Sequence, residues 1–330
     1  MLDPRELVTV DPDPQARETL EELGVLDALG DPEAPAPTEA AEHGLVLVQA
    51  LDGFVDAGGA TAMVRRHLLE AFDPHPVARF DVDQLLDYRA RRPLMQFTSD
   101  HWESYADPQL AISLLRDAAG TPFLLLSGPE PDYQWERFVA AVIDLARRLG
   151  VRLTIGLNAI PFGVPHTRPA GVTPHATRPE LIAGYESWLD SVQVPSGAGH
   201  LLEYRLGQTG MAAVGFAAHV PHYVAQSEYP PAAMALLDAL ARVTGLLLPS
   251  DELREAAKAT AAAVDAQIAE TPEAAAAVAA LEQQYDAWAQ AHGRENLLAP
   301  GSASLPTGDQ LAAQFERFLA EQARRPDQPE

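Results

Sequence analysis

Leu45–Leu69, with the sequence LVLVQALDGFVDAGGATAMVRRHLL, is the stretch that decides the fold. Its first four residues form an apolar run that is short enough for a strand buried on both faces. A turn at 52–56 follows, and apolar residues then recur at helical spacing: Ala60, Met63, Val64, Leu68 and Ala71. This strand–loop–helix order predicts the opening unit of a parallel α/β sheet, with the loop where such folds bind their partners.

The downstream sequence continues the α/β pattern. The best helix is predicted at Trp135–Leu149, where apolar residues keep i, i+3, i+4 spacing before Gly150. We predict a last core helix at Pro230–Val243. Short apolar runs predict strands at 77–82, 94–97, 110–116, 123–126 and 151–157, with 110–116 and 123–126 forming an antiparallel hairpin.

The stretch from 158 to 217 is harder to interpret. Residues 158–177 are rich in Pro and His, and they predict a long irregular loop of the kind that is often functional. Thr177 and Glu180 form a capping box that predicts a helix through Leu189. We expect two further strands at 201–206 and 212–217, joined over 207–210.

Composition divides the chain into an acidic Pro-rich segment (1–43), a core domain (44–250) and an Ala-rich helical arm (251–330). The formal net charge of −24 lies mainly at the ends, with −10 on the first segment and −8 on the arm. The N-terminal segment shows no core-forming pattern beyond a short helix at 17–29. The arm predicts helices at 251–270, from Thr271 to about 293, and from Thr307.

Several classes of protein are disfavoured. An acidic chain repels nucleic-acid phosphates and anionic membrane surfaces. The sequence has no cysteine, so disulfides and thiolate chemistry are excluded. It shows no signal-peptide pattern and no apolar run of about 20 residues, which predicts a cytoplasmic protein. Strong cofactor and catalytic motifs are missing from the text of the sequence, so we expect no cofactor.

Candidate binding residues lie in loops that follow predicted strands. Asp52 and Asp56 flank the first loop, and Gly58 opens the helix after it. The free N–H groups of that helix could hold an anion, although two carboxylates oppose this. The alternative is that Asp56 caps the helix. Glu130 and Asp132 follow the strand at 123–126, where Asp132 is a natural cap for the helix at Trp135.

A second group of candidates lies in two His-containing segments. His166 and Arg168, in a loop fixed by prolines, could bind a phosphate or carboxylate. Alternatively, Arg168 forms a structural ion pair with one of the acidic loops. His219 and His222 could join His166 or His175 in a metal site. Pro221 prevents the helix that would place both on one face, so we expect no metal.

Five segments together resemble the proteasome assembly chaperone 2 family, in its actinobacterial branch of unassigned function. They are DGFVDAGGA (52–60), DYRARRP (87–93), LLLSGPEPDYQWERF (124–138), IPFGVPHTRPAGVTPHA (160–176) and HVPHYVA (219–225). The resemblance spans about residues 44–270. It implies a three-layer α/β/α core with a mixed, mostly parallel sheet, similar to the phosphorylase/hydrolase fold. The family supplies no established catalytic residues, so none is assigned.

The resemblance and the acidic helical ends favour a non-catalytic oligomeric scaffold or assembly factor. The expected partner is a second copy of the chain, with a trimer suggested by the phosphorylase-like core, and the family name adds proteasome components. The alternative is a nucleoside- or anion-binding protein or enzyme on the same core. In that case the nine candidate residues should converge on one cleft, with Arg168 facing one of the four carboxylates.

Overall fold

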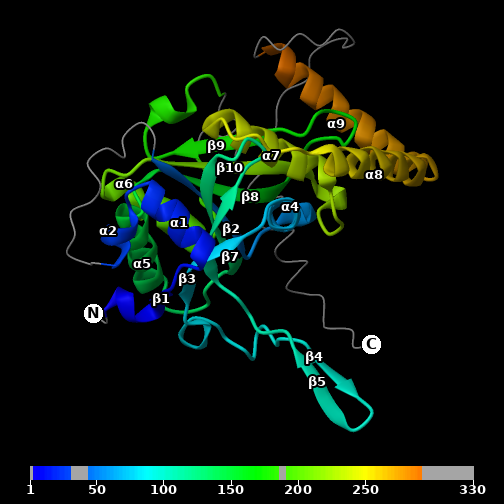
Figure 1. Ribbon diagram of the computed structural model, residues 1–330. Helices are drawn as coiled ribbons and strands as arrows, with labels where there is room; N and C mark the ends of the chain where they lie inside the picture. Colours follow the sequence, from blue (N-terminus) through cyan, green and yellow to red (C-terminus); the bar gives the residue numbers. More distant parts are fainter. Residues whose placement is uncertain (1–2, 31–43, 186–190, 292–330) are drawn as a thin grey trace.

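The predicted opening strand is β2 (Leu45–Asp52), which lies inside an eight-stranded sheet in the computed structural model (Figure 1). The structure describes residues 3–30, 44–185 and 191–291. Within them the strand order is β1-β3-β6-β7-β2-β8-β10-β9. The four strands β7, β2, β8 and β10 are parallel, and the remaining pairs are antiparallel. The other strands of this sheet are β1 (Val8–Val10), β3 (His75–Phe80), β6 (Ala111–Arg116), β7 (Pro122–Pro129), β8 (Val151–Phe162), β9 (Val172–Ala176) and β10 (Ala213–Pro221).

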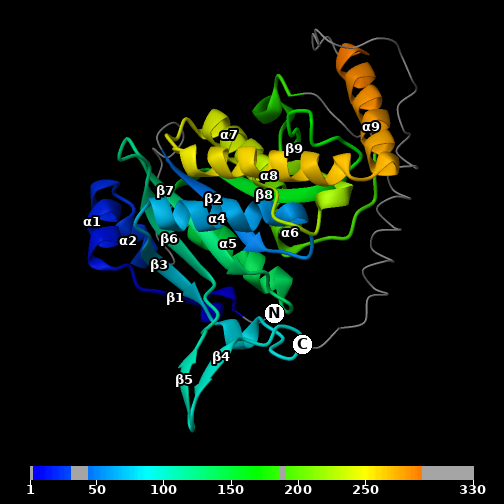
Figure 2. The ribbon, with the colours of Figure 1, turned by 90° about the vertical axis from the view of Figure 1, so that its right-hand side faces the viewer.

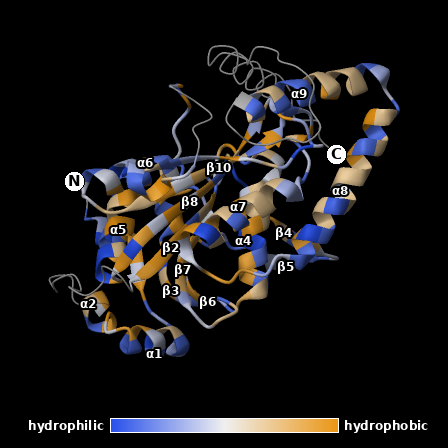
Figure 3. Ribbon diagram, turned by 90° about the horizontal axis from the view of Figure 1, so that it is seen from above, coloured by the Kyte–Doolittle hydropathy of each residue, from blue (hydrophilic) through white to orange (hydrophobic). Residues whose placement is uncertain are grey.

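Helices cover both faces of the sheet, so the predicted three-layer α/β/α class is confirmed (Figure 3). One face packs on α4 (Ala60–Ala71) and α7 (Pro230–Thr244). The other face packs on α5 (Trp135–Arg148) and α6 (Ala198–Gln208). Successive side chains of a strand point to opposite faces. Val46 and Val48 of β2 therefore belong to the first core, and Leu45 and Leu47 belong to the second.

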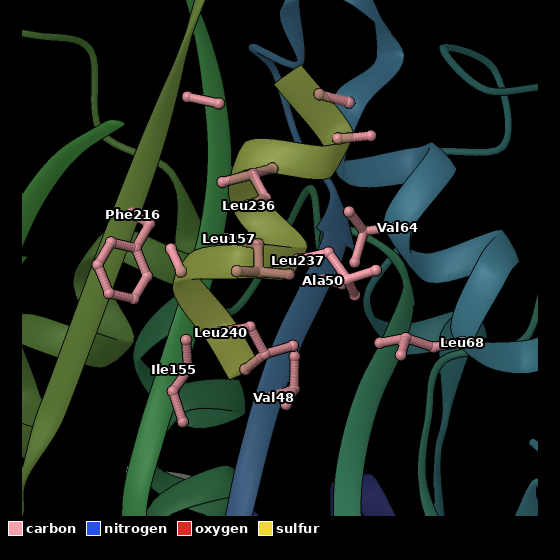
Figure 4. Packing of buried hydrophobic residues seen from close by; sticks show 14 of the residues in the cluster. Val48, Ala50, Val64, Leu68, Ile155, Leu157, Phe216, Leu236, Leu237 and Leu240 are labelled. Carbon is pink, nitrogen blue, oxygen red and sulfur yellow. The ribbon is translucent and has the colours of Figure 1, made fainter. Parts of the chain in front are cut away.

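The core between the sheet and α7 is built from β-branched and aliphatic side chains. Figure 4 shows Val48 and Ala50 of β2 next to Ile155 and Leu157 of β8, with Leu237 and Leu240 of α7 among them. On α4, Val64 and Leu68 close the side of this cluster. The helical spacing predicted after residue 60 therefore faces the core as expected.

The predicted hairpin is confirmed: β6 and β7 pair antiparallel, with Ile112 opposite Leu126. The predicted strand at 94–97 is β4 (Met95–Thr98), but it does not join the main sheet. It pairs with β5 (His101–Tyr105), which the sequence did not suggest. This second hairpin projects away from the body of the molecule (Figures 1 and 2).

The prediction that the N-terminal segment lacks a buried face is wrong for the described residues 3–30. Here β1 adds an edge strand to the main sheet, with Val8 opposite Phe80. The chain then forms α1 (Pro14–Glu22) and α2 (Leu26–Gly30) in place of one helix at 17–29. Leu7, Leu20 and Leu29 are buried in the core beside α5. The apolar residues of this segment were too widely spaced to show a period, yet these three leucines belong to the core on this face of the sheet.

Three predictions between 158 and 217 are wrong in whole or in part. The predicted irregular loop is strand at both ends, because β8 continues to Phe162 and β9 pairs with β10, and its middle, 163–171, is irregular as predicted. The predicted strand at 201–206 is α6, in which Ala198, Leu202 and Leu206 recur every four residues and face the core. The predicted helix at 177–189 is a single 3₁₀ turn, Pro179–Ile182, because the Thr177 hydroxyl bonds the 211–213 segment. Residues 186–190 of that prediction lie outside the described residues.

The arm begins with α8 (Asp251–Ala269) and α9 (Pro272–Ala291), as predicted. Leu253 of α8 belongs to the core cluster that contains α7, so this helix packs on the body. Figures 1 and 2 show α9 turning back beside the loop that follows β8. The predicted helix from Thr307 lies outside the described residues.

Candidate functional site

The first loop, between β2 and α4, has the capping geometry of the simpler interpretation. The Asp56 carboxylate accepts hydrogen bonds from the backbone N–H groups of Thr61 and Ala62, at 2.8 and 2.9 Å. Burial raises the pKa of Asp56, and these two amides oppose that shift. Because the Asp56 carboxylate already accepts hydrogen bonds from these N–H groups of the helix, they are not available to an external anion.

Gly58 fixes the entry to α4 by close approach to a distant segment. Its φ is +64°, and a Cβ there would lie 2.7 Å from Cβ of Tyr229. The Gly58 N–H donates to the carbonyl of Ala225, and its carbonyl accepts from the Tyr229 N–H, both at 2.8 Å. The glycine therefore joins the start of α4 to the start of α7.

The other predicted carboxylates have separate partners. Asp52 is exposed at the end of β2 and pairs with Arg65 of α4. Asp132 accepts a hydrogen bond from the Asp87 N–H at 2.8 Å and pairs with Arg91 at 3.1 Å. These two contacts of Asp132 hold the 87–93 loop in place. The expected capping of α5 by Asp132 does not match the N-cap position, which Gln134 occupies.

Glu130 is the deepest of the predicted carboxylates. It is buried, and it accepts hydrogen bonds from the backbone N–H groups of Phe54 (3.2 Å) and Ala198 (2.5 Å). Burial raises its pKa, while those two amides lower it. Glu130 thus connects the loop after β2 to the first turn of α6.

His166 and Arg168 bind the C-terminal arm. The Nε2 atom of His166 is 2.9 Å from an Asp265 carboxylate oxygen on α8, and its Nδ1 is 2.7 Å from the Tyr223 hydroxyl. Arg168 pairs with Glu282 and Asp286 on α9. The expectation that Arg168 faces one of the four predicted carboxylates is therefore wrong. It does form a structural ion pair, but with the arm.

The two later histidines do not form a cluster. His219 is buried, stacks on Phe162 at 4.1 Å between ring centroids, and lies 2.7 Å from the Thr173 hydroxyl. His222 is exposed next to Tyr223. Within residues 3–30, 44–185 and 191–291, no group of three His, Asp or Glu side chains could hold a metal ion.

A small pocket of about 60 Å³ lies over the carboxyl ends of β2 and β8, beneath the start of α6. Of the nine predicted residues, Glu130 is the one that lines it. The remaining polar lining comes from His175, which was considered only as a metal ligand, and from residues that were not predicted as a site: Gln49, Thr61, Asn158, Ser196, His200 and Glu203. His175 and Glu203 hydrogen-bond at 2.8 Å, and both also line a more open groove of about 430 Å³ beside the pocket.

One signal for this pocket was present in the sequence. Gln49 is the single polar residue in the run LVLVQAL, where a fully buried strand calls for apolar side chains. Glu203 could not be placed, because 201–206 had the pattern of a strand, and His200 directly precedes that segment. On α6 they lie almost one turn apart on the same side of the helix.

The projecting hairpin carries a second candidate surface. Its cross-strand pairs are Met95 with Tyr105 and Phe97 with Trp102, and the last two rings meet at 5.2 Å. Phe97 is 56% exposed and Trp102 is 62% exposed. We name these four residues the hairpin patch. Exposed apolar clusters of this kind mark contact sites for other molecules.

The chain is similar in sequence and in structure to known proteins. The sequence model of the PAC2 family matches residues 50–268. No curated protein sequence matches the chain. The crystal structure of the Mycobacterium tuberculosis unknown function protein Rv2714 is similar, with 48% identity and a TM-score of 0.74, covering 88% of this chain and 96% of that one.

Two further crystal structures are similar. A protein of unknown function from Corynebacterium glutamicum ATCC 13032 has 35% identity and a TM-score of 0.76, covering 87% of this chain and 99% of that one. The Mycobacterium tuberculosis proteasome-assembly chaperone homologue Rv2125 has 28% identity and a TM-score of 0.66, covering 71% of this chain and all of that one. Within the described residues, no helix has the length and apolar character needed to cross a bilayer.

Proposed function

The chain belongs to the PAC2 family, and from that membership we propose that it is a cytoplasmic homo-oligomer with an assembly-chaperone-like role, acting through protein–protein contacts. The family match and the similarity to a proteasome-assembly chaperone homologue support the role. The contacts that we propose are carried by the hairpin patch. Proteasome components are the class of protein that the relative's description suggests as a further partner.

The hairpin patch is the observation that supports this function most strongly. A two-stranded hairpin is at best marginally stable on its own in water. β4 and β5 form a sheet of their own, separate from the eight-stranded sheet, and they project from the body (Figure 2). Aromatic side chains are enriched at protein interfaces, where they bury large areas at low entropic cost. An ordered projecting hairpin with exposed Phe97 and Trp102 therefore suits insertion into a partner.

We assign a second copy of this chain as the first occupant, on grounds of charge. The chain carries a formal net charge of −24. Arg89 and Arg92 are exposed on the loop that leads into the hairpin, where acidic side chains such as Asp83 and Asp107 are exposed as well. Complementary potentials bring surfaces together and fix their register. The two exposed guanidinium groups next to the apolar hairpin patch can therefore pair with exposed carboxylates of a neighbour, and a second copy of this acidic chain offers such carboxylates.

Site-specific photo-cross-linking tests the proposal. A benzophenone amino acid replaces Trp102 in the full chain, and in a matched control it replaces Tyr204, which is equally exposed at 62% but lies on α6. After irradiation, we expect position 102 to give a covalent product of two chains, with the cross-link identified by mass spectrometry. Irradiation that leaves position 102 without any product of two chains would refute the assignment.

A further inference from the structure

One row of registered residues crosses four strands on the face of the sheet that α6 covers. Gln49 of β2 is opposite Gly156 of β8, Gly156 is opposite Gly215 of β10, and Gly215 is opposite His175 of β9. The Gln49 side chain lies over Gly156, and the His175 side chain lies over Gly215. A Cβ on Gly156 would stand 3.3 Å from Oε1 of Gln49, and one on Gly215 would stand 1.8 Å from the His175 ring.

The first residues of α6 and the glycine before it pack against this row of residues. A Cβ on Gly199 would lie 2.9 Å from both Oε1 and Nε2 of Gln49. A Cβ on Gly197 would lie 2.7 Å from Oε1 of Glu130. The Gln49 amide thus lies between the backbone of β8 at Gly156 and the backbone of α6 at Gly199. We name the pocket around it the Gln49 slot, lined by Gln49, Gly156, Asn158, Gly199 and His200.

The Gln49 amide lies in the slot without a hydrogen bond. Gln49 is 7% exposed. No residue in the described ranges hydrogen-bonds to its side chain, although a primary amide offers two donors and an acceptor oxygen. Burying such a group without partners costs free energy, so buried amides are nearly always paired. The amide atoms of Gln49 are not among the fully buried, unpartnered atoms of the described residues, so they reach the pocket and can pair there with a ligand that supplies both a donor and an acceptor.

His200 and Asn158 bring two hydrogen-bond donors face to face in the same pocket. The side-chain oxygen Oδ1 of Asn158 accepts from the Ala159 N–H at 2.7 Å, so the Asn158 NH₂ group lies toward Nε2 of His200, at 3.2 Å. Nδ1 of His200 accepts from the Gly197 N–H at 3.2 Å. A neutral imidazole has one acceptor nitrogen, so Nε2 carries the proton and faces another donor. Partial desolvation lowers the pKa of His200 and so disfavours its charged form. The His200 side chain is exposed, so its N–H and the Asn158 NH₂ group can donate to an acceptor that enters from solvent.

We propose that the Gln49 slot binds a small uncharged molecule through a carboxamide-type edge. The carbonyl oxygen of that edge accepts from the donors at Asn158 and His200, and its N–H group donates to Oε1 of Gln49. An anion supplies acceptors alone, and the carboxylates of Glu130 and Glu203 in the pocket wall repel it. A cation supplies donors alone, so it leaves Asn158 and His200 unmatched.

The volume of the slot sets the size of the bound group. A water molecule needs roughly 10–15 Å³ of such space, and the pocket offers about 60 Å³. One functional group therefore fits inside. The rest of the molecule extends into the adjacent groove along His175 and Glu203. This binding is independent of the hairpin patch and goes beyond the proposed function.

Ligand-observed saturation-transfer NMR on the full chain tests the proposal. The probes are acetamide and benzamide at millimolar concentration, with acetate and benzoate as matched charged probes. Gln49→Leu removes the amide while keeping a similar volume. Gln226→Leu, the same replacement at an exposed position outside the slot, is the control. Gly199→Ala is a second variant that fills the slot from α6.

We expect saturation transfer to both amides, at least fivefold stronger than to either carboxylate. Gln49→Leu and Gly199→Ala should abolish it, and Gln226→Leu should leave it unchanged. Gln49→Leu should also melt at a higher temperature than the unliganded parent, because it replaces a largely buried amide that has no protein partner among the described residues by an apolar side chain. Absence of transfer to the amides, equal transfer to the carboxylates, or unchanged transfer in both slot variants would overturn the proposal.

Discussion

Arg168 binds Asp286 through two parallel hydrogen bonds, from Nε and Nη2 to the two carboxylate oxygens, each 2.8 Å long. The residues are 118 positions apart. This bidentate pair joins the loop between β8 and β9 to α9. Glu282 adds a third contact to Nη1 of Arg168 at 3.1 Å. Planar bidentate pairing is the strongest geometry for this type of interaction, so the arm has a defined attachment to the core.

Arg168→Ala should loosen the arm. The Asp286 carboxylate is 10% exposed, and it would lose its guanidinium partner. Exposed pairs contribute about 0–1 kcal/mol and breaking buried ones costs about 3–5 kcal/mol, so we expect an intermediate cost of about 2 kcal/mol. Hydrogen exchange of α9 should become faster while exchange of β2 stays unchanged. Arg66→Ala, which breaks the exposed pair with Glu228, is the control. Equal exchange of α9 in both variants would show that the pair does not hold the arm.

Leu7→Ala should destabilise the protein strongly. Leu7 is 0% exposed and packs in the core beside α5, so the change leaves a cavity. Large-to-small replacements in cores cost about 2–5 kcal/mol. Leu23→Ala, in the same segment but 39% exposed, should change stability by about 0.5 kcal/mol or less. Urea unfolding curves measure both. A Leu7→Ala midpoint equal to that of the parent would mean that the N-terminal segment is not part of the fold.

Gly58→Ala should be worse than Gly59→Ala, although both glycines have positive φ angles. A left-handed conformation costs any other residue about 1–2 kcal/mol. A Cβ at 58 would also overlap Tyr229, whereas none of the described atoms lies within 4 Å of a Cβ at 59. Overpacking adds roughly 1–3 kcal/mol. Thermal unfolding of the two variants measures the difference. Equal melting temperatures would contradict the close approach of α4 and α7.

Glu130→Gln should change the pH dependence of stability. The pKa of Glu130 is raised in the folded protein, chiefly by burial, so the folded state holds its proton more tightly than the unfolded state does. Its contribution is present below the unfolded pKa and is lost as pH rises through the folded pKa. Glutamine does not titrate. The melting temperature of the variant minus that of the parent should therefore increase with pH from about pH 4 upward. A constant or decreasing difference would contradict the raised pKa.

Local patterns predicted the parts of the fold that local physics determines. The apolar run of β2, the helical spacing of α5 and the Asp56 cap each depend on residues a few positions apart. These patterns located the central strands and the layers. The strand predicted at 201–206 was wrong because Leu201–Leu206 fits both periods over so few residues. Burial of Leu202 and Leu206 against the sheet selects the helix.

The site could be predicted less completely because its contacts are distant in sequence. The partners of Arg168 lie on α9, and nothing near residue 168 indicates them. The Gln49 slot requires the order β2-β8-β10-β9, which places Gly156 and Gly215 side by side. That order is a property of the whole sheet. Only the unusual glutamine within an apolar strand marked the position in advance.

Static light scattering of the full chain tests the central claim most directly. The mass of one chain is 35.5 kDa. We predict that the parent protein has a mass that is a multiple of this value at micromolar concentration. The double variant Phe97→Ser and Trp102→Ser, which removes the aromatic pair of the hairpin patch, should return to the mass of one chain. A parent protein of 35.5 kDa, or a double variant with the same assembled mass as the parent, would contradict the proposed assembly through the hairpin.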